Sequence, residues 1–210
     1  IYPESVIKQL AESKQKMYVM VLTHNGFIKK MELDDFVSLT ASGIFYTKLD
    51  QGDFVKTIII GGDALDVITF SDKKALRFSA KEIPLVRRSA RGVRSIGGKT
   101  VEYVDGMTLV AGKDITDVVV VTKNGYLNRF NINALPKSQR AKAGSSVVKL
   151  SKTDKINSIH IVNQNDVIRL VTEHGITDVK VSDVPTGSSI SAGTKCINGK
   201  DTVVKSMMVK

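Results

Sequence analysis

The sequence predicts an all-β protein, a four-bladed, propeller-like disc that is preceded by a short helical segment. Three observations lead to this class. A similar segment recurs about every fifty residues along the chain. Each copy joins a short β-branched run to a turn and a return run, which is the pattern of a hairpin. Each copy also holds roughly four such runs, the content of one propeller blade, and a blade must stack on its neighbours to bury both faces.

Residues 1–17 are predicted to form a connecting helix. Pro3 suits a first helical turn, and Val6 and Leu10 share one face of it. The chain begins with Ile1 rather than Met, which suggests a fragment of a longer protein. Its first residues also lack the basic and apolar regions of a signal peptide.

From Tyr18 onward, short β-branched runs replace the helical pattern. The steps Asn25-Gly26 and Asn124-Gly125 predict tight hairpins of type I′, which need positive φ at both central residues. The opening runs lie at 19–22, 67–70, 118–121 and 167–171, and the return runs at 27–31, 75–78, 126–130 and 176–179.

After each return run the chain enters a loop rich in Ser, Ala and Gly, followed by a further pair of expected strands such as 101–104 with 107–110. Asp63, Asp114 and Asp166 mark the seams between copies. We therefore expect a β domain over 18–210, made of the repeats 18–63, 64–114, 115–166 and 167–210. The four loops are loop 1 (38–44, with Gly43), loop 2 (85–95, with Gly92), loop 3 (137–146, with Gly144) and loop 4 (186–195, with Gly193).

Composition narrows the possible partners and the compartment. No stretch approaches eighteen uninterrupted apolar residues, so no membrane span is expected. The lone Cys196 excludes an internal disulfide framework and fits the reducing cytoplasm. The formal net charge of +10 favours a polyanionic partner, nucleic acid before an anionic membrane.

Catalytic chemistry is not indicated. His24 and His174 occupy equivalent turns, His160 lies in a strand-like run, and no pair has the spacing of metal ligands. The acidic residues stand at turns, and the Gly-Gly steps at 61–62 and 97–98 lack the Lys-Ser/Thr tail of a phosphate loop. We therefore expect no catalytic residues, no metal and no cofactor.

Positive charge gathers in loops 2 and 3. Basic side chains interleaved with Gly, Ser and Ala suit a phosphate backbone, because small residues let the main chain approach and long cations supply charge. The expected phosphate contacts in loop 2 are Arg87, Arg88, Arg91 and Arg94, and those in loop 3 are Lys137, Arg140 and Lys142. Of these, Arg88 and Arg91 are expected nearest to a bend in the nucleic acid.

The return runs add four cations at matching positions, Lys29, Lys30, Arg77 and Arg129, as secondary contacts. Repetition should line all these residues up as a charged rim, on which a duplex must bend to stay in contact. The rim is asymmetric, because loop 1 has no basic residue and Asp178 stands at the position that Arg129 holds in repeat three. The contact arc is therefore expected on repeats two and three.

The pattern leaves other functions open. The contacts should be non-specific, because no recognition helix or stacking aromatic is placed to read bases. A basic solvated face, a propeller that docks an acidic protein partner and a propeller enzyme with a site at its central channel are the alternatives. The apolar opening runs do not supply polar groups for such a channel site.

The blocks 21–30 and 120–130, and Glu82-Ile83-Pro84 followed by residues 88–92, resemble the repeat in the C-terminal domain of bacterial type IIA topoisomerase A subunits. The resemblance covers nearly everything from residue 18. It implies a β-pinwheel, a propeller-like disc whose neighbouring blades exchange strands and whose basic perimeter binds and bends duplex DNA. No arginine precedes any of the five tyrosines, so the DNA-cleaving Tyr of the family is absent.

The resemblance also implies partners and a class. The parent enzyme would be an ATP-dependent topoisomerase, in which the rest of the A subunit joins the ATPase B subunit in a heterotetramer at the nucleoid, while the isolated domain is expected to be monomeric. Gyrase wraps DNA with a Gln-Arg-Arg-Gly-Gly-Lys/Arg-Gly box, which loop 1 lacks. This departure favours the A subunit of topoisomerase IV, which bends DNA without full wrapping. A gyrase domain without the box and a phage relative are the alternatives.

Overall fold

The computed structural model describes residues 16–36, 46–98, 101–111, 116–199 and 201–209. The predicted helix over 1–17 lies outside these residues except for 16 and 17, which belong to no helix or strand. Loop 1 and Asp114 also lie outside them. No helix among the described residues is long and apolar enough to cross a membrane.

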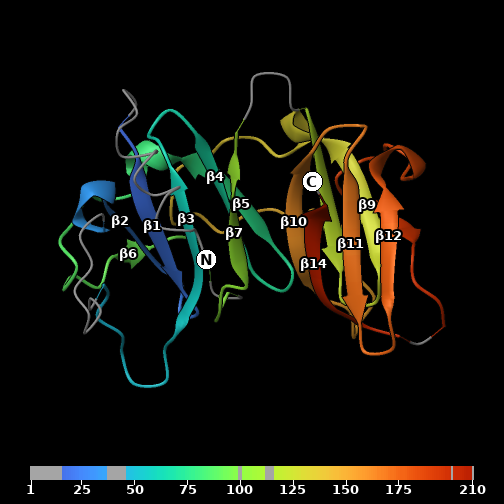
Figure 1. Cartoon of the computed structure of the whole chain (residues 1–210), viewed down its shortest axis with the longest axis horizontal. Coiled ribbons are helices and arrows are strands. Elements are labelled where there is room, and N and C mark those ends of the chain that lie inside the picture. The colour runs from blue at the N-terminus through green and yellow to red at the C-terminus, as the bar shows by residue number, and fades with distance from the viewer. Residues whose placement is uncertain (1–15, 37–45, 99–100, 112–115, 200, 210) are drawn as a thin grey trace.

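Four antiparallel sheets follow one another along the chain (Figure 1), which confirms the predicted all-β, four-bladed fold. Blade 1 contains β3 (Val55–Gly61), β1 (Tyr18–Thr23), β2 (Phe27–Glu32) and β6 (Val93–Arg94), and blade 2 contains β5 (Ala75–Ser79), β4 (Asp66–Phe70) and β7 (Gly106–Val110). Blade 3 contains β10 (Ile156–Val162), β8 (Asp117–Thr122), β9 (Tyr126–Asn131) and β13 (Thr194–Lys195), and blade 4 contains β12 (Ile176–Lys180), β11 (Val167–Thr172) and β14 (Val203–Val209).

A single turn of 3-10 helix follows each return strand. These turns are η1 (Leu33–Phe36), η2 (Ala80–Glu82), η3 (Ile132–Ala134) and η4 (Val181–Asp183). Ser79 and Asn131 cap the starts of η2 and η3 with their side-chain oxygens, which satisfies N–H groups that a short helix leaves open.

The predicted hairpins are present, but their turn type differs from the prediction. Gly26 and Gly125 take positive φ, whereas the asparagines before them do not. Gly26 N instead donates to Thr23 O at 2.9 Å, which closes a three-residue loop. This is the alternative hairpin geometry in which only the last loop residue is left-handed.

Neighbouring repeats exchange strands. The short β6 belongs to repeat two but pairs with β2 of blade 1, and β13 of repeat four pairs with β9 of blade 3. Between them, Ser145 of loop 3 forms an antiparallel bridge to Ala75 on β5. Each of loops 2, 3 and 4 therefore lies on the blade before its own. The expected strand at 101–104 is not formed, and that segment is irregular.

Glycine is required where each exchanged loop crosses the preceding blade. Gly92, Gly144 and Gly193 all have positive φ, and a Cβ on them would lie 2.6, 2.8 and 2.5 Å from main-chain oxygens of the blade beneath. A side chain there would meet backbone, which cannot move aside. The fifty-residue spacing of these glycines thus records the crossing points of the exchanged loops.

Three of the core clusters in the described structure combine residues of neighbouring blades, and a fourth lies within blade 1, around Val19, Val21 and Met31. Met20 of β1 packs with Phe78 of β5, Ile68 of β4 with Val118 of β8, and Val119 of β8 with Leu170 of β11. The innermost strands are in contact in the order β3, β7, β10 and β14. Blades 1 and 4 lie at opposite ends of the molecule (Figure 1).

Blade 4 has no exchanged strand among the described residues. The residue of the return strand that pairs with the last apolar residue of the opening strand is Ile28, Ala75 or Leu127 in blades 1 to 3. All three residues are fully buried. The equivalent Ile176 of blade 4 is 65% exposed. Among the described residues, no exchanged segment therefore covers the outer edge of β12.

Candidate nucleic-acid interface

Loop 2 is held on the outer edge of blade 1 by a series of main-chain hydrogen bonds. Lys30 N donates to Pro84 O at 3.0 Å, Val86 N donates to Lys30 O at 3.0 Å, and Ser95 N donates to Gly26 O at 2.9 Å. Because the main chain is fixed at both ends of the loop, its side chains project from a defined surface.

Arg91 and Arg94 lie over one aromatic ring at this edge. The guanidinium carbon of Arg91 is 3.7 Å from the centroid of the Phe27 ring, and that of Arg94 is 5.4 Å away. Arg91 also forms an ion pair with Asp50, and Arg94 donates to Asn25 O. Both arginines remain exposed, so the ring orients their guanidinium planes without covering them.

Arg87 and Arg88 are exposed and form no ion pair with any described residue. Ala90 N donates to Arg87 O at 3.0 Å, which closes the turn that carries both side chains. Their positive charge is therefore available to an outside anion.

Loop 3 crosses the outer edge of blade 2 in the same way. Ser138 N donates to Arg77 O at 2.8 Å, and Lys137 Nζ lies 2.7 Å from Asp66 Oδ1 while its side chain stays 52% exposed. Lys142 is exposed. Arg140 is only partly exposed, because its guanidinium Nε donates to Glu82 O at 3.1 Å.

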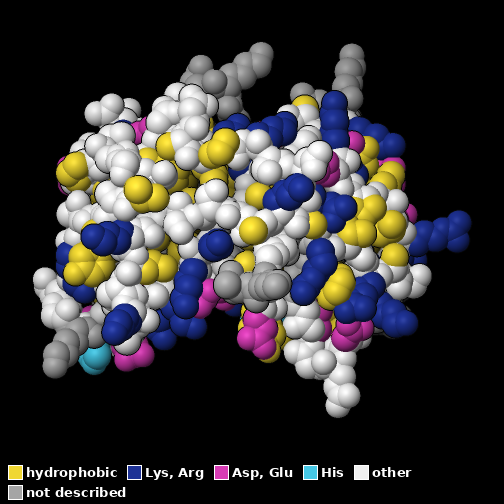
Figure 2. All heavy atoms as spheres, turned by 180° about the vertical axis from the view of Figure 1, so that it is seen from behind, with side chains coloured by type: hydrophobic (Ala, Val, Ile, Leu, Met, Phe, Trp, Pro, Cys, Tyr) yellow, Lys and Arg dark blue, Asp and Glu magenta, His cyan; other side chains and the backbone are white. Residues whose placement is uncertain are grey.

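Loops 2 and 3 are joined to each other. Arg140 Nη1 donates to Arg94 O, Ala141 N donates to Ser95 O at 3.0 Å, and Gly97 N donates to Lys142 O at 2.8 Å. The basic residues of the two loops therefore share one continuous surface across the joint between blades 1 and 2. Figure 2 shows Lys and Arg side chains scattered over one face among uncharged and hydrophobic ones, with several Asp and Glu near its lower border.

The prediction that Lys30, Arg77 and Arg129 lie on the rim is corrected. Lys30 is 4% exposed and pairs with Asp63, whereas Arg77 Nη2 lies 2.9 Å from Asp66 and Arg129 Nη2 lies 2.6 Å from Asp117. Each side chain also donates to main-chain oxygens of the 3-10 turn in the next repeat. They are cations of the blade joints, because each one donates to an oxygen that also accepts the main-chain N–H closing the 3-10 turn of the next repeat.

Lys29 is also buried rather than on the rim, at 1% exposure. Its Nζ donates to Arg88 O at 2.6 Å and to Ala90 O at 2.8 Å. Burial lowers the pKa of Lys29 to about 8. The side chain therefore supports loop 2 from below.

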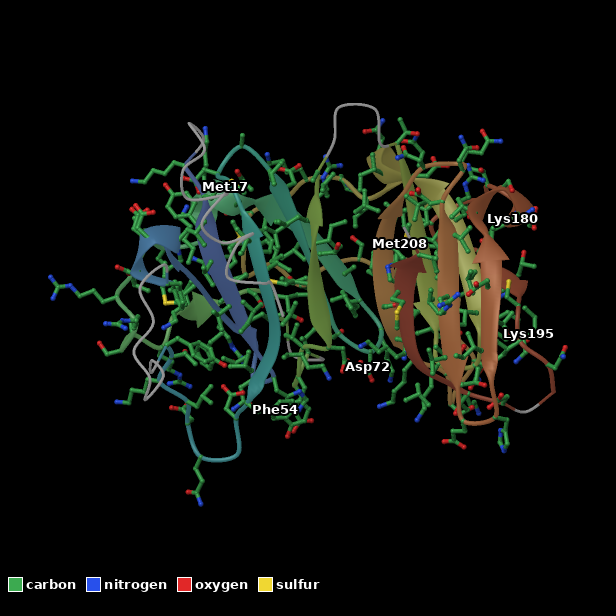
Figure 3. The ribbon with its side chains drawn as sticks, in the orientation of Figure 1. Met17, Phe54, Asp72, Lys180, Lys195 and Met208 are labelled. Carbon is green, nitrogen blue, oxygen red and sulfur yellow. The ribbon has the colours of Figure 1, made fainter. Side chains whose placement is uncertain are left out.

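One candidate contact in loop 4 escaped the sequence analysis. Lys195 Nζ lies 5.2 Å from the Tyr126 ring and donates to Asn124 O at 2.5 Å, which is the arrangement of Arg94, Phe27 and Asn25 repeated on blade 3. Alignment of the loops on their glycines could have found it. Lys195 lies near the end of the molecule opposite Phe54 of blade 1 (Figure 3).

The turn histidine of repeat one lies in an aromatic stack that nothing in the sequence signalled. The His24 ring is 4.6 Å from Phe54 and 4.4 Å from Tyr103, nearly parallel to both. The two outer rings are about half exposed. The three residues come from repeats one and two, so the stack closes the inner side of that joint.

An open cavity of about 570 Å³ lies beside β10 and β14, and its lining includes Lys56, Lys123 and Lys205. Beside it, His160 Nε2 lies 2.8 Å from Ser206 Oγ, a contact between β10 and β14. Burial lowers the pKa of His160 to about 4, so the ring is neutral at physiological pH. No three metal-ligating side chains cluster within the described part of the chain.

Known proteins share this geometry and sequence. The family model described as "DNA gyrase C-terminal domain, beta-propeller" matches residues 18–60, 66–105 and 116–163. The A subunit of DNA gyrase from Borrelia hermsii (strain HS1 / DAH) is 31% identical over 170 residues, which cover 80% of this chain and 21% of the relative. That of Buchnera aphidicola subsp. Baizongia pistaciae (strain Bp) is 25% identical, covering 86% and 21%. The chain thus spans about a fifth of the length of these relatives.

Two solved structures share the fold. The C-terminal domain of DNA topoisomerase IV superposes with a TM-score of 0.85 at 24% identity, covering 94% of this chain and 63% of that one. The DNA gyrase A C-terminal domain superposes with a TM-score of 0.82 at 23% identity, covering 93% and 66%.

Proposed function

The chain belongs to the DNA gyrase C-terminal domain family, and we propose that it binds duplex DNA without sequence specificity and bends it. The contact surface consists of loops 2 and 3, with Arg87, Arg88, Arg91, Arg94, Lys137 and Lys142 facing phosphates. Arg140 acts mainly as the latch between the loops. Lys195 extends the surface toward blade 3.

The hydrogen bonds between loops 2 and 3 carry this proposal. They merge two basic loops from different repeats into one surface, supported by three main-chain or side-chain bonds at the joint. Contacts from such a surface to the phosphate backbone of DNA fix the position of a duplex without reading its bases. A duplex that follows both loops changes direction between blades, and the added phosphate contacts offset the cost of bending.

We further propose that bending stops short of full wrapping. The sequence has no Gln-Arg-Arg-Gly-Gly box, and loop 4 offers a single lysine where loop 2 offers four arginines. The charge therefore favours a short arc of contact. In the parent protein, which we take to be an ATP-dependent type IIA topoisomerase acting in the cytoplasm with its B subunit, such an arc would present a DNA segment for strand passage.

A salt titration tests the proposal. The affinity for a linear duplex is measured from about 50 to about 200 mM NaCl, where each phosphate neutralised contributes about −0.9 to the slope of log K against log salt. The double variant Arg87→Ala, Arg88→Ala should lower the slope by up to about 1.8. The matched control Lys123→Ala, Lys205→Ala removes the same charge from the cavity beside β10 and β14 and should leave the slope unchanged.

Equal slopes for the two double variants would place the DNA elsewhere than on the loops. The rival function, docking of an acidic protein, predicts weak duplex binding at about 150 mM salt in every variant. Circular dichroism melts of all variants would show that the fold is intact, as expected for exposed side chains.

A further inference from the structure

The buried ammonium of Lys29 lies directly beneath the most basic loop of the protein. Its Nζ donates to the main-chain oxygens of Arg88 and Ala90, and no described carboxylate pairs with it. A buried charge that is solvated only by carbonyls is costly to fold. The cost of burying this ammonium therefore indicates that Lys29 has a role beyond packing.

The geometry around Lys29 determines the path of loop 2. The loop crosses the lysine at Gly92, where a Cβ would lie 3.2 Å from the Cβ of Lys29 and 2.6 Å from Ile28 O. The two oxygens that accept from Nζ turn inward, while the side chains of Arg87, Arg88 and Arg91 stay exposed. Holding the carbonyls down thus presents the guanidinium groups outward.

At the equivalent position of blade 3, a buried side chain holds loop 4 in the same way. Asn128 is 1% exposed, and its Nδ2 donates to Val147 O at 3.0 Å and to the loop 4 oxygens of Ser188 and Ser189 at 3.2 and 3.3 Å. Lys29 opposes Val21 and Asn128 opposes Val120 in matching registers. Blade 2 has Leu76 at this position, and loop 3 relies on Arg140 instead.

We propose that Lys29 is a positioning residue for DNA binding: it orders loop 2 before the duplex arrives, so that the arginines need not be ordered on contact. This inference rests on the proposed function. A preordered loop avoids the entropy cost that a mobile loop would meet on binding. The effect is on affinity and not on the number of phosphates contacted.

Two variants separate positioning from direct contact. Lys29→Met removes both hydrogen bonds, and Lys29→Gln keeps a donor without charge. Lys29→Met should weaken duplex binding about tenfold at every salt concentration while the salt slope stays as in the wild type, because the exposed arginines remain. Lys29→Gln should recover most of the affinity. Asn128→Leu is the matched control: it removes the equivalent hydrogen bonds beneath loop 4, which carries Lys195 as its single cation, and it should weaken duplex binding much less than Lys29→Met does.

Hydrogen exchange of loop 2 provides a readout that needs no DNA. Faster exchange at Ala90 in Lys29→Met than in the wild type supports the inference. Wild-type DNA affinity together with wild-type hydrogen exchange in Lys29→Met would overturn the inference. A salt slope lowered by about 0.9 would also overturn it, because that change marks a direct phosphate contact. If the wild type does not bind duplex at all, the proposed function fails, and the exchange rates alone decide the positioning role.

Discussion

Arg140 of loop 3 donates a hydrogen bond from Nη1 to the main-chain oxygen of Arg94 in loop 2. Its own main-chain N–H is fixed by the Glu82 carboxylate at 2.8 Å. One side chain thereby ties two repeats together at the surface where their basic residues meet. Because the bond uses a backbone acceptor, it leaves the side chain of Arg94 exposed at the surface.

Replacing this latch should weaken both stability and DNA binding. Arg140→Met removes two side-chain hydrogen bonds from a partly buried charged donor, so the free energy of unfolding should fall by about 1–3 kcal/mol. Arg140→Lys keeps the charge but loses the planar fork, and it should lose stability while keeping the salt slope of DNA binding. Urea denaturation and the duplex titration measure the two effects. Wild-type stability of Arg140→Met would show that the latch does not hold the loops together.

The crossing glycines should tolerate no side chain. In Gly92→Ala the Cβ would meet Ile28 O at 2.6 Å in addition to the strain of positive φ, so we expect the loss to exceed clearly the roughly 1–2 kcal/mol of left-handed strain alone. Gly52 has positive φ but open space, so Gly52→Ala isolates the strain. Gly175 has neither a positive φ nor a close neighbour, so Gly175→Ala should be neutral or slightly stabilising. Equal losses at Gly92 and Gly52 in thermal melts would contradict the crossing geometry.

Stability should rise with pH because of Lys29. Its pKa is about 8 in the folded protein and near the ordinary value of about 10.5 in the unfolded chain. Below about pH 8 the lysine is charged in both states, and the full cost of burying that charge is present. Between these two pH values the unfolded chain binds more protons, so the free energy of unfolding increases and the cost disappears.

Other groups titrate in the same range, so the difference between the wild type and Lys29→Met is the quantity to measure. The wild type should gain stability relative to the variant from about pH 7 to about pH 9.5. A constant difference over that range would mean that Lys29 has an ordinary pKa.

The buried ion pairs at the blade joints should be sensitive to removal of one partner. Asp117→Asn leaves Arg129 in a site where the paired side chains are only 11% and 15% exposed, and we expect a loss of about 3–5 kcal/mol. The pair Arg169–Asp178 of blade 4 is exposed at 40% and 42%. Asp178→Asn is therefore the matched control and should melt close to the wild type. A similar loss in both variants would show that burial does not distinguish the pairs.

The open edge of blade 4 should tolerate truncation that the covered edges do not. Leu127→Ala removes a fully buried side chain beneath the exchanged β13 and should cost about 2–5 kcal/mol. Ile176→Ala, at the equivalent exposed position, should change the free energy of unfolding by less than about 0.5 kcal/mol. Denaturant titration compares them. A large loss at Ile176 would show that this edge is covered in solution.

Much of the fold was accessible from the sequence because the repeat presents each feature several times. The hairpins, the four sheets and the crossing glycines all recur with one period, and the resemblance implied strand exchange. The strand predicted at 101–104 failed because Val101 and Val104 are buried without pairing. Apolar β-branched residues indicate burial rather than strand pairing as such. Here the burial comes from packing against blade 1.

The candidate site was predicted only in part. Loops 2 and 3 stand out by their charge, and all of the basic residues predicted there except Arg140 are exposed. The return-strand cations were misplaced because each is held by main-chain oxygens of the next repeat, which periodicity does not reveal. Asp66 and Asp117, which lie on the strands beside Arg77 and Arg129, were the available sign of ion pairing.

Site-directed cross-linking tests the central claim most directly. A photoreactive group is attached to a cysteine placed at Ser89 in loop 2 or at Ser146 in loop 3, in a Cys196→Ser background, with Lys205→Cys on β14 as the control. If the two loops form one surface for a bent duplex, both loop positions will cross-link to the same DNA fragment and the β14 position will not. Cross-links from β14 alone, or from only one of the two loops, would contradict the account.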